Sequence, residues 1–263
     1  PALTLIKDEL NISFSDTQLV LTLYFLFLAI GQIIAGPFSD RYGRKPILLL
    51  GAFIYSSSAF VACFSNSIEF LLLLRCIQGF GAAACLSVGR TVVSDCFERA
   101  EAAKQMSKIT AVMAIIPILC FIFGGLLAEF FGWRYNLAAL GSISFILIIF
   151  MLWVLEETLI NKAETISFLN MFQVYKNLIK NSLFRLFTIT TAMQTSMFFA
   201  MNGFMPYEFS RQGVSVSEFG MWFSLTSMGY IVGNIINGKF GSKIGLEKMC
   251  LIGTTFSLFT VFL

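Results

Sequence analysis

Long apolar runs separated by short polar segments dominate the chain. Seven of these runs are about 20 residues or longer, and an eighth begins at Leu251 and is still apolar at Leu263. The seven cover about residues 17–37, 46–64, 70–93, 106–131, 136–155, 183–207 and 217–239. A helix needs about 20 mostly apolar residues to cross the hydrocarbon of a bilayer. The pattern therefore predicts an all-α membrane protein with seven complete spans and one partial span.

The composition agrees with a membrane protein and excludes several other classes. Of the 263 residues, 57% are hydrophobic and only 13% are charged, whereas soluble domains carry about 25% charged residues. A net charge of +3 is too small for a nucleic-acid-binding surface. The chain has no histidine, and its six cysteines form no CxxC pair, so we expect no metal and no cofactor. No nucleophile with a base appears, and we expect no enzyme.

Basic residues mark one side of the predicted membrane protein. Fourteen of the 18 Lys and Arg fall in alternate polar segments that share a side. Short basic loops stay in the cytoplasm, which predicts that residues 38–46, 94–108, 156–182 and 239–249 are cytoplasmic. Arg75 alone is placed inside a span and away from its ends.

The polar stretch after the fifth complete run divides the chain. It is amphipathic, and we expect residues 159–182 to form a linker on the cytoplasmic membrane surface. Residues 1–158 and 183–263 are then two helical halves, the second of them truncated. Because the chain begins with Pro1 and stops inside an apolar run, we expect it to be part of a longer protein, with residues 1–15 a loop that follows a missing helix.

A short internal repeat links the two halves. The segment GPFSDRYG at residues 36–43 parallels GKFGSKIG at residues 238–245, with a constant offset of 202. Both segments follow a span that runs from outside to inside. Parallel repeats of this kind occur in a major class of secondary transporters.

The first copy carries a distinctive order of residues. Together with Arg44 and Lys45, which follow it, this segment resembles the signature loop between the second and third helices of the major facilitator superfamily. The matching residues are Gly36, Asp40, Arg41, Gly43, Arg44 and Lys45. The resemblance implies a partial helical bundle of that family, with helices 2 to 8 complete and helix 9 begun. It also implies that Asp40 pairs with Arg44 and with a helix N-terminus of the second half, as a gate that stabilises one state of alternating access. The alternative is a tight turn with ordinary cytoplasmic charges.

Three further stretches match the same superfamily. The first contains Arg75 and Gln78, and Arg75 resembles the family's buried arginine tied to proton coupling; the alternative is an Arg that snorkels to the interface. The second resembles the antiporter signature of the fifth helix, which packs against the eighth; its residues are Pro117, Gly124, Gly125, Gly229 and Gly233. Phe121 stands where the drug-efflux pattern has a second Pro, and ordinary helix packing explains the glycines equally well.

The third stretch is FGWRY at residues 131–135. With Asp95 and Glu157 it resembles the bicyclomycin-resistance (Bcr/CflA) branch of the drug:proton antiporters. Aromatic and basic residues at a membrane interface are also ordinary anchors.

A substrate cavity between the halves is expected to be lined by aromatic, Met and amide side chains. The candidates on the seventh and eighth helices are Met193, Gln194, Met197, Phe198, Asn202, Tyr230 and Asn234. Alternatively, the Met and Phe residues face lipid, while amides in lipid are costly.

These observations lead to one favoured function and two alternatives. The favoured function is a proton-coupled multidrug efflux transporter, a drug:H⁺ antiporter of the bacterial inner membrane, monomeric at full length. Its partners are a lipophilic drug or metabolite, protons and the lipid bilayer, with no nucleic acid. All 15 acidic residues fall in loops or at span ends, and the resemblance to related antiporters implies that the proton-carrying carboxylate lies in the missing first helix. The alternatives are an inactive, truncated or split-gene remnant, and a metabolite or sugar uptake transporter of the same superfamily.

Overall fold

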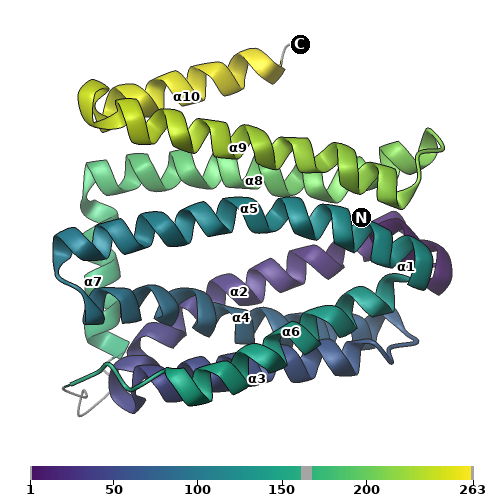
Figure 1. The fold of residues 1–263 in the computed structure, drawn as a ribbon, viewed down its shortest axis with the longest axis horizontal. Coiled ribbons are helices and arrows are strands. Elements are labelled where there is room, and N and C mark those ends of the chain that lie inside the picture. Colours follow the sequence, from purple (N-terminus) through teal and green to yellow (C-terminus); the bar gives the residue numbers. More distant parts are fainter. Residues whose placement is uncertain (1, 161–167, 262–263) are drawn as a thin grey trace.

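The chain is a bundle of long helices (Figure 1). The computed structural model describes residues 2–160 and 168–261, and this part of the chain contains helices and turns without strands. The helices are α1 (Leu3–Leu10), α2 (Phe14–Tyr42), α3 (Arg44–Ala62), α4 (Ile68–Cys96), α5 (Arg99–Phe131), α6 (Trp133–Val154), α7 (Phe168–Lys180), α8 (Ser182–Arg211), α9 (Val216–Ile244) and α10 (Leu246–Val261).

Local polar residues start several of these helices. The Ser13 hydroxyl accepts the Asp16 N–H at 3.1 Å before α2, and the Ser67 hydroxyl accepts the Phe70 N–H at 3.3 Å before α4. The Asn181 side-chain oxygen does the same for the first turn of α8. Each cap satisfies first-turn N–H groups that have no partner inside the helix.

The predicted spans appear as long helices, and the all-α membrane fold is confirmed. Within the described residues, six segments are long and apolar enough to cross a membrane: α2, α3, α4, residues 104–131 of α5, α6 and residues 216–236 of α9. Helix α8 has 30 residues, but polar residues such as Thr188, Gln194 and Asn202 interrupt its apolar run. Helix α10 has 16 residues.

Two sequence-based expectations about the segments between spans were wrong. Residues 1–15 do not form a simple loop, because Leu3–Leu10 is a helix that buries Leu3 and Ile6. The turns are also shorter than the polar segments suggested: a single residue, Gly43, separates α2 from α3, and Gly245 separates α9 from α10. An apolar run marks only the part of a helix inside hydrocarbon, while the backbone hydrogen bonds continue into the polar surface.

The helices form two groups with α5 between them (Figure 1). We call α1–α6 the first half and α8–α10 the second half. Helix α4 packs against α2 and α3, α3 packs against α6, and α5 packs chiefly against α9 of the second half. Helix α7 runs across the ends of the long helices. We name the two ends of the bundle after Arg44, in the first turn of α3, and Glu129, near the C-terminus of α5.

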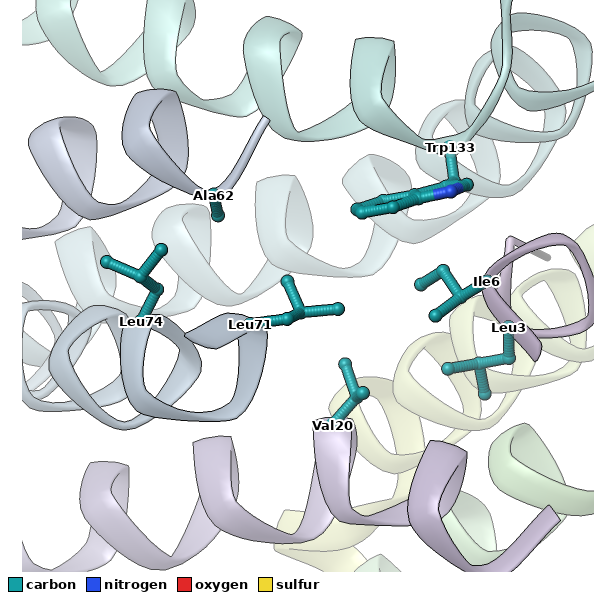
Figure 2. Packing of buried hydrophobic residues seen from close by; sticks show 7 residues of the cluster. All are labelled: Leu3, Ile6, Val20, Ala62, Leu71, Leu74 and Trp133. Carbon is teal, nitrogen blue, oxygen red and sulfur yellow. The ribbon is translucent and has the colours of Figure 1, made fainter. Parts of the chain in front are cut away.

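A hydrophobic cluster holds the first half together at the Glu129 end (Figure 2). Trp133 is 1% exposed and lies over Ile6 of the short helix α1, with Leu71 of α4 and Val20 of α2 beside it. Burial of these side chains explains why α1 forms, since a helix of eight residues is unstable alone. The helix is therefore part of the first half.

The repeat seen in the sequence is also present in the structure. Helices α2 and α9 end at Tyr42 and Ile244, and α3 and α10 begin at Arg44 and Leu246, so both boundaries differ by 202 residues. The two connecting glycines, Gly43 and Gly245, have φ of +108° and +90°. This backbone conformation is open to glycine and strained for other residues.

Candidate functional site

Arg44 is the centre of a charge network at its end of the bundle. Its side chain is 7% exposed and contacts two carboxylates, Asp40 at 2.5 Å and Asp95 at 2.8 Å. It also donates to the Ser39 hydroxyl at 2.6 Å, and the Thr158 hydroxyl donates to Asp95. The Asp40–Arg44 pair agrees with the prediction. The pairing of Asp95 with Arg44 was missed, although Asp95 belongs to a family motif, because the two residues are far apart in sequence.

Glu157 occupies the helix N-terminus beside this network. Its carboxylate accepts the backbone N–H of Arg44 at 2.8 Å and of Lys45 at 3.3 Å. The Lys45 ammonium in turn donates to the Leu152 carbonyl at 3.3 Å. A Cβ on Gly43 would overlap this carboxylate, so glycine is required here both for φ and for space. The helix N-terminus next to Asp40 is therefore that of α3 in the same half.

Other members of the predicted gate lie at the margin of the network. Asp40 is exposed over half of its side chain. Arg41 is exposed, and its guanidinium lies over the Tyr42 ring at 5.4 Å. Gly36 has open space around it, and its carbonyl accepts the Ser39 hydroxyl at 2.8 Å. The network thus has one buried cation with carboxylates from α2 and α4, and it draws in the C-terminal end of α6.

Arg75 makes its contacts inside the first half. Its guanidinium donates to the Gln78 side-chain oxygen at 2.5 Å and to the Val20 carbonyl at 3.3 Å. It also lies over the Tyr24 ring, 4.3 Å from the centroid. Gln78 is fully buried, and its amide nitrogen has no hydrogen-bond partner. Among the described residues no carboxylate pairs with Arg75, so neutral dipoles and an aromatic face compensate its charge.

Helices α5 and α9 approach closely at two glycines near the Glu129 end. A Cβ on Gly125 would stand 2.9 Å from the Val216 carbonyl, and one on Gly220 would overlap the Phe121 carbonyl. The Phe121 ring meets the Phe223 ring edge to face at 4.9 Å. Backbones touch here because neither glycine has a side chain.

The predicted glycine set for this contact is only partly the observed one. Gly125 takes part, whereas a Cβ placed on Gly124, Gly229 or Gly233 would meet nothing within 4 Å among the described residues. The Gly124 carbonyl instead accepts the Asn136 side chain at 3.1 Å. Gly220 was missed, although Gly220 and Phe223 recur at helical spacing in the sequence. Helix α5 continues through Pro117 from Arg99 to Phe131.

A second contact between the halves joins α2 and α8. The Gln18 amide donates to the Gly203 carbonyl at 2.6 Å. Phe14 meets Tyr207 with ring centroids 4.4 Å apart, and Phe25 meets Phe199 at 4.1 Å. The face of α8 that contacts the first half is thus set by Phe199, Gly203 and Tyr207.

The two halves separate toward the Arg44 end. Among the described residues, the hydrogen bonds and ring contacts between them run from the Glu129 end to about the middle of the helices. On α9 the buried residues fall between Ser217 and Ser227, and residues 228–236 are exposed or half-buried. On α8 residues 191–200 are all exposed. Among the residues that the structure describes, hydrogen bonds and ring contacts therefore join the halves at the Glu129 end, which we call closed, and not at the Arg44 end, which we call open.

The predicted substrate residues lie on the exposed parts of α8 and α9. Met193 is 70% exposed, and Met197, Phe198, Gln194 and Tyr230 are also exposed. Asn202 and Asn234 donate to carbonyls of their own helices, four residues earlier. These amides are thus satisfied locally and leave their oxygens available.

A well-formed cavity lies elsewhere, within the first half. It has a volume of about 730 Å³ and is lined by α2, α3, α4 and α6. Its surface is apolar except for groups such as the Tyr24, Tyr55 and Ser144 hydroxyls. A second cavity of about 450 Å³ lies between α5 and α6 and shares Leu140 and Ile143 with the first. None of the seven predicted substrate residues lines either cavity.

Comparisons with known proteins agree with this architecture. The sequence matches the Major Facilitator Superfamily along residues 1–263. It is 30% identical over 260 residues to the "Bicyclomycin resistance protein homolog" of Haemophilus influenzae, covering 96% of this chain and 64% of that protein. It is 28% identical to the "Chloramphenicol resistance protein" of Pseudomonas aeruginosa, covering 96% and 60%. The chain thus spans less than two thirds of the length of these relatives.

A solved structure resembles the fold. It is a bacterial homolog to the human lysosomal transporter Spinster, in an inward-facing and unoccupied conformation. The TM-score is 0.73 at 18% identity, and the match covers 94% of this chain and 58% of that one. At this identity the likeness shows a shared fold.

Proposed function

The chain belongs to the major facilitator superfamily of membrane transporters, and from this premise we propose that the intact protein exports lipophilic drugs or metabolites in exchange for protons. A transporter of this kind works by rocking two helical halves around a central site. The resistance proteins named above support a drug as cargo. The observation that carries the proposal is the asymmetric contact between the halves, closed at the Glu129 end and open at the Arg44 end.

The basic residues support an orientation for this exporter. The Arg44 end carries the Lys- and Arg-rich segments, and we assign it to the cytoplasm of a bacterial cell, with the protein in the inner membrane. The end at which the described residues of the two halves do not contact each other then faces the cytoplasm, where an exporter loads its cargo. Exposed Met and Phe side chains on α8 suit varied apolar molecules because they repack around different shapes.

Helix α7 is proposed to lie along the cytoplasmic membrane surface as the link between the halves. It crosses the ends of the long helices (Figure 1). Phe172, Tyr175 and Ile179 recur on one exposed face, and Lys176 and Lys180 lie along one edge of it. Such a helix buries its apolar face among lipid headgroups and keeps its lysines in water. The linker residues 161–167 lie outside the described part of the chain.

Arg75 is proposed to take part in proton coupling. A charged side chain inside the membrane costs at least about 2.5 kcal/mol, and the hydrogen bonds to Gln78 and Val20 hold its charge in the interior. A fixed cation there favours loss of a proton from a nearby carboxyl group. Such a group would lie in the part of the intact protein beyond this chain.

Transport by the intact protein in inverted membrane vesicles tests the proposal. We expect a fluorescent lipophilic cation to accumulate inside when the vesicle lumen is acidified, and a protonophore to abolish the accumulation. Arg75→Ala should remove the response to the proton gradient while leaving substrate binding, measured by fluorescence polarisation, in place. Accumulation without any proton gradient, or full coupling in Arg75→Ala, would contradict the exchange mechanism. Transport of a sugar with no effect of any lipophilic cation would favour the uptake alternative.

A further inference from the structure

We propose that Glu129 is the latch of the outer gate, a positioning residue that acts by holding the N-terminus of α9 against α5. The proposal rests on alternating access between the two halves. It concerns the closure of the Glu129 end and does not depend on which molecule is carried.

The latch is a charge-assisted hydrogen bond across the interface between the halves. The Glu129 carboxylate accepts the backbone N–H of Ser217 at 2.7 Å. Ser217 is the second residue of α9, so this N–H has no partner inside its helix. The same position is the positive end of the helix dipole, which favours a carboxylate. Glu129 thus caps a helix of the opposite half.

The other carboxylates at this end bond within their own half. Glu9 accepts the indole N–H of Trp133 and pairs with Arg134, all in the first half. Glu218 accepts the Ser215 N–H at 3.1 Å, at the start of its own helix. In the part of the chain that the structure describes, Glu129 is therefore distinguished by a partner in the second half.

The contacts next to the latch are apolar and non-directional. Gly125 and Gly220 bring the backbones together, and the Phe121 and Phe223 rings meet behind them. Such surfaces tolerate sliding, whereas a hydrogen bond fixes one register. Glu129 is exposed already, whereas Ser217 is buried, so the Ser217 N–H loses its carboxylate partner and turns to water when the outer end opens. The bond therefore exists only in the closed state, as a latch requires.

The experiment reports opening of the outer gate directly. In the intact protein every native cysteine is replaced, including the six of this chain, and Ser227→Cys is introduced as a reporter. Ser227 is 4% exposed, on the stretch of α9 that is buried, and its hydroxyl has no hydrogen-bond partner. A membrane-impermeant maleimide added from outside labels it only when the outer gate opens. We expect Glu129→Ala to raise the labelling rate roughly tenfold, as for loss of a hydrogen bond to a charged group.

Two further variants make the result decisive. Glu129→Gln keeps an acceptor oxygen but loses the charge, so its labelling rate should lie between those of wild type and Glu129→Ala. Glu218→Gln is the matched control, because it removes a carboxylate from the same helix terminus without touching the other half; we expect a rate within about twofold of wild type. If Glu129→Ala does not accumulate in the membrane, the labelling rate of Glu129→Gln is compared with that of Glu218→Gln instead.

Equal labelling of the Glu129 variants and Glu218→Gln would overturn the latch. The readout also separates this inference from the proposed cargo. If no drug is transported but the labelling rates differ as expected, the proposed cargo is wrong and the role of Glu129 as a latch stands. If drug is transported but the Glu129 variants do not change the labelling rate, the latch is wrong and the proposed transport function stands.

Discussion

The two ends of the bundle are stabilised in opposite ways. At the Arg44 end a buried guanidinium ties α3 to carboxylates of α2 and α4, and Glu157 adds the end of α6. All these elements belong to the first half. At the Glu129 end, small residues and aromatic rings join the first half to the second, with one carboxylate bond across the interface. Charged groups thus join the helices within the first half at the Arg44 end. Mainly apolar contacts join the first half to the second at the Glu129 end.

The largest effect is expected from Arg44→Ala. The change leaves Asp95, whose side chain is 22% exposed, without its cation and removes the link between three helices. Breaking a mostly buried ion pair costs about 3 kcal/mol. We expect a strongly lowered thermal midpoint in detergent, measured by near-ultraviolet circular dichroism. Arg41→Ala, at an exposed position beside the network, should leave the midpoint close to wild type; equal losses would show that the network adds no rigidity.

A smaller effect, of a different kind, is expected from Gly220→Ala. The new Cβ would overlap the Phe121 carbonyl, and such overpacking costs about 1–3 kcal/mol. Because the strain falls between the halves, closure of the outer gate and the transport rate should fall roughly tenfold while the thermal midpoint moves less than in Arg44→Ala. Gly229→Ala on the same helix has open space and should transport normally. A midpoint loss as large as that of Arg44→Ala would mean that the two ends do not differ.

Glu157→Gln should weaken the Arg44 end by a smaller amount. The two carboxylate oxygens accept the N–H groups of Arg44 and Lys45 separately, so the single amide oxygen replaces one of them, and the interaction of the carboxylate with the helix dipole is lost. That interaction is worth about 0.3–1 kcal/mol. Glu156→Gln changes the same charge at the adjacent, exposed residue. Comparing the unfolding midpoints of Glu157→Gln and Glu156→Gln tests whether Glu157 caps the N-terminus of α3. Identical midpoints would exclude that role.

The smallest expected effect is the response of α1 to acid. The Arg134 guanidinium holds the pKa of Glu9 below its ordinary value, so the folded state favours the ionised form. This contribution is present above the ordinary carboxyl pKa and is lost as the pH falls through the lowered pKa of Glu9. Because Glu9 is half exposed, solvent weakens the effect.

Trp133 reports this titration, because its indole donates to Glu9 at 2.8 Å. With Trp153 and Trp222 replaced by Phe, the emission of Trp133 should shift to the red as the medium outside is acidified. Glu9→Gln should abolish the shift, and Asp8→Asn should keep it. A shift that persists in Glu9→Gln would assign the titration to another group.

Sequence patterns predicted the helices and the repeat well but the contacts unevenly. Hydropathy finds spans because each must bury about 20 apolar residues. The resemblance of the motif around Gly43 to the family's loop implied the Asp40–Arg44 pair, whose residues lie on either side of one short turn. Asp95 and Glu157 are distant in sequence from Arg44, and no local pattern reveals such a pairing. The same holds for Gly220, which acquires its role only when α5 lies against it. Helix α1 was missed because eight residues carry a weak periodic signal and depend on Trp133 for burial.

The one-residue connections at Gly43 and Gly245 also bear on how the protein is made. Two helices joined by a single residue cannot take up independent orientations in the membrane, because the connection is too short. We therefore expect α2 with α3, and α9 with α10, to enter the bilayer as hairpins. The basic residues at each bend, such as Arg41 and Lys45, then orient two helices at once. A charge change at such a bend acts on the topology of a pair, whereas α4, with longer connections on both sides, inserts alone.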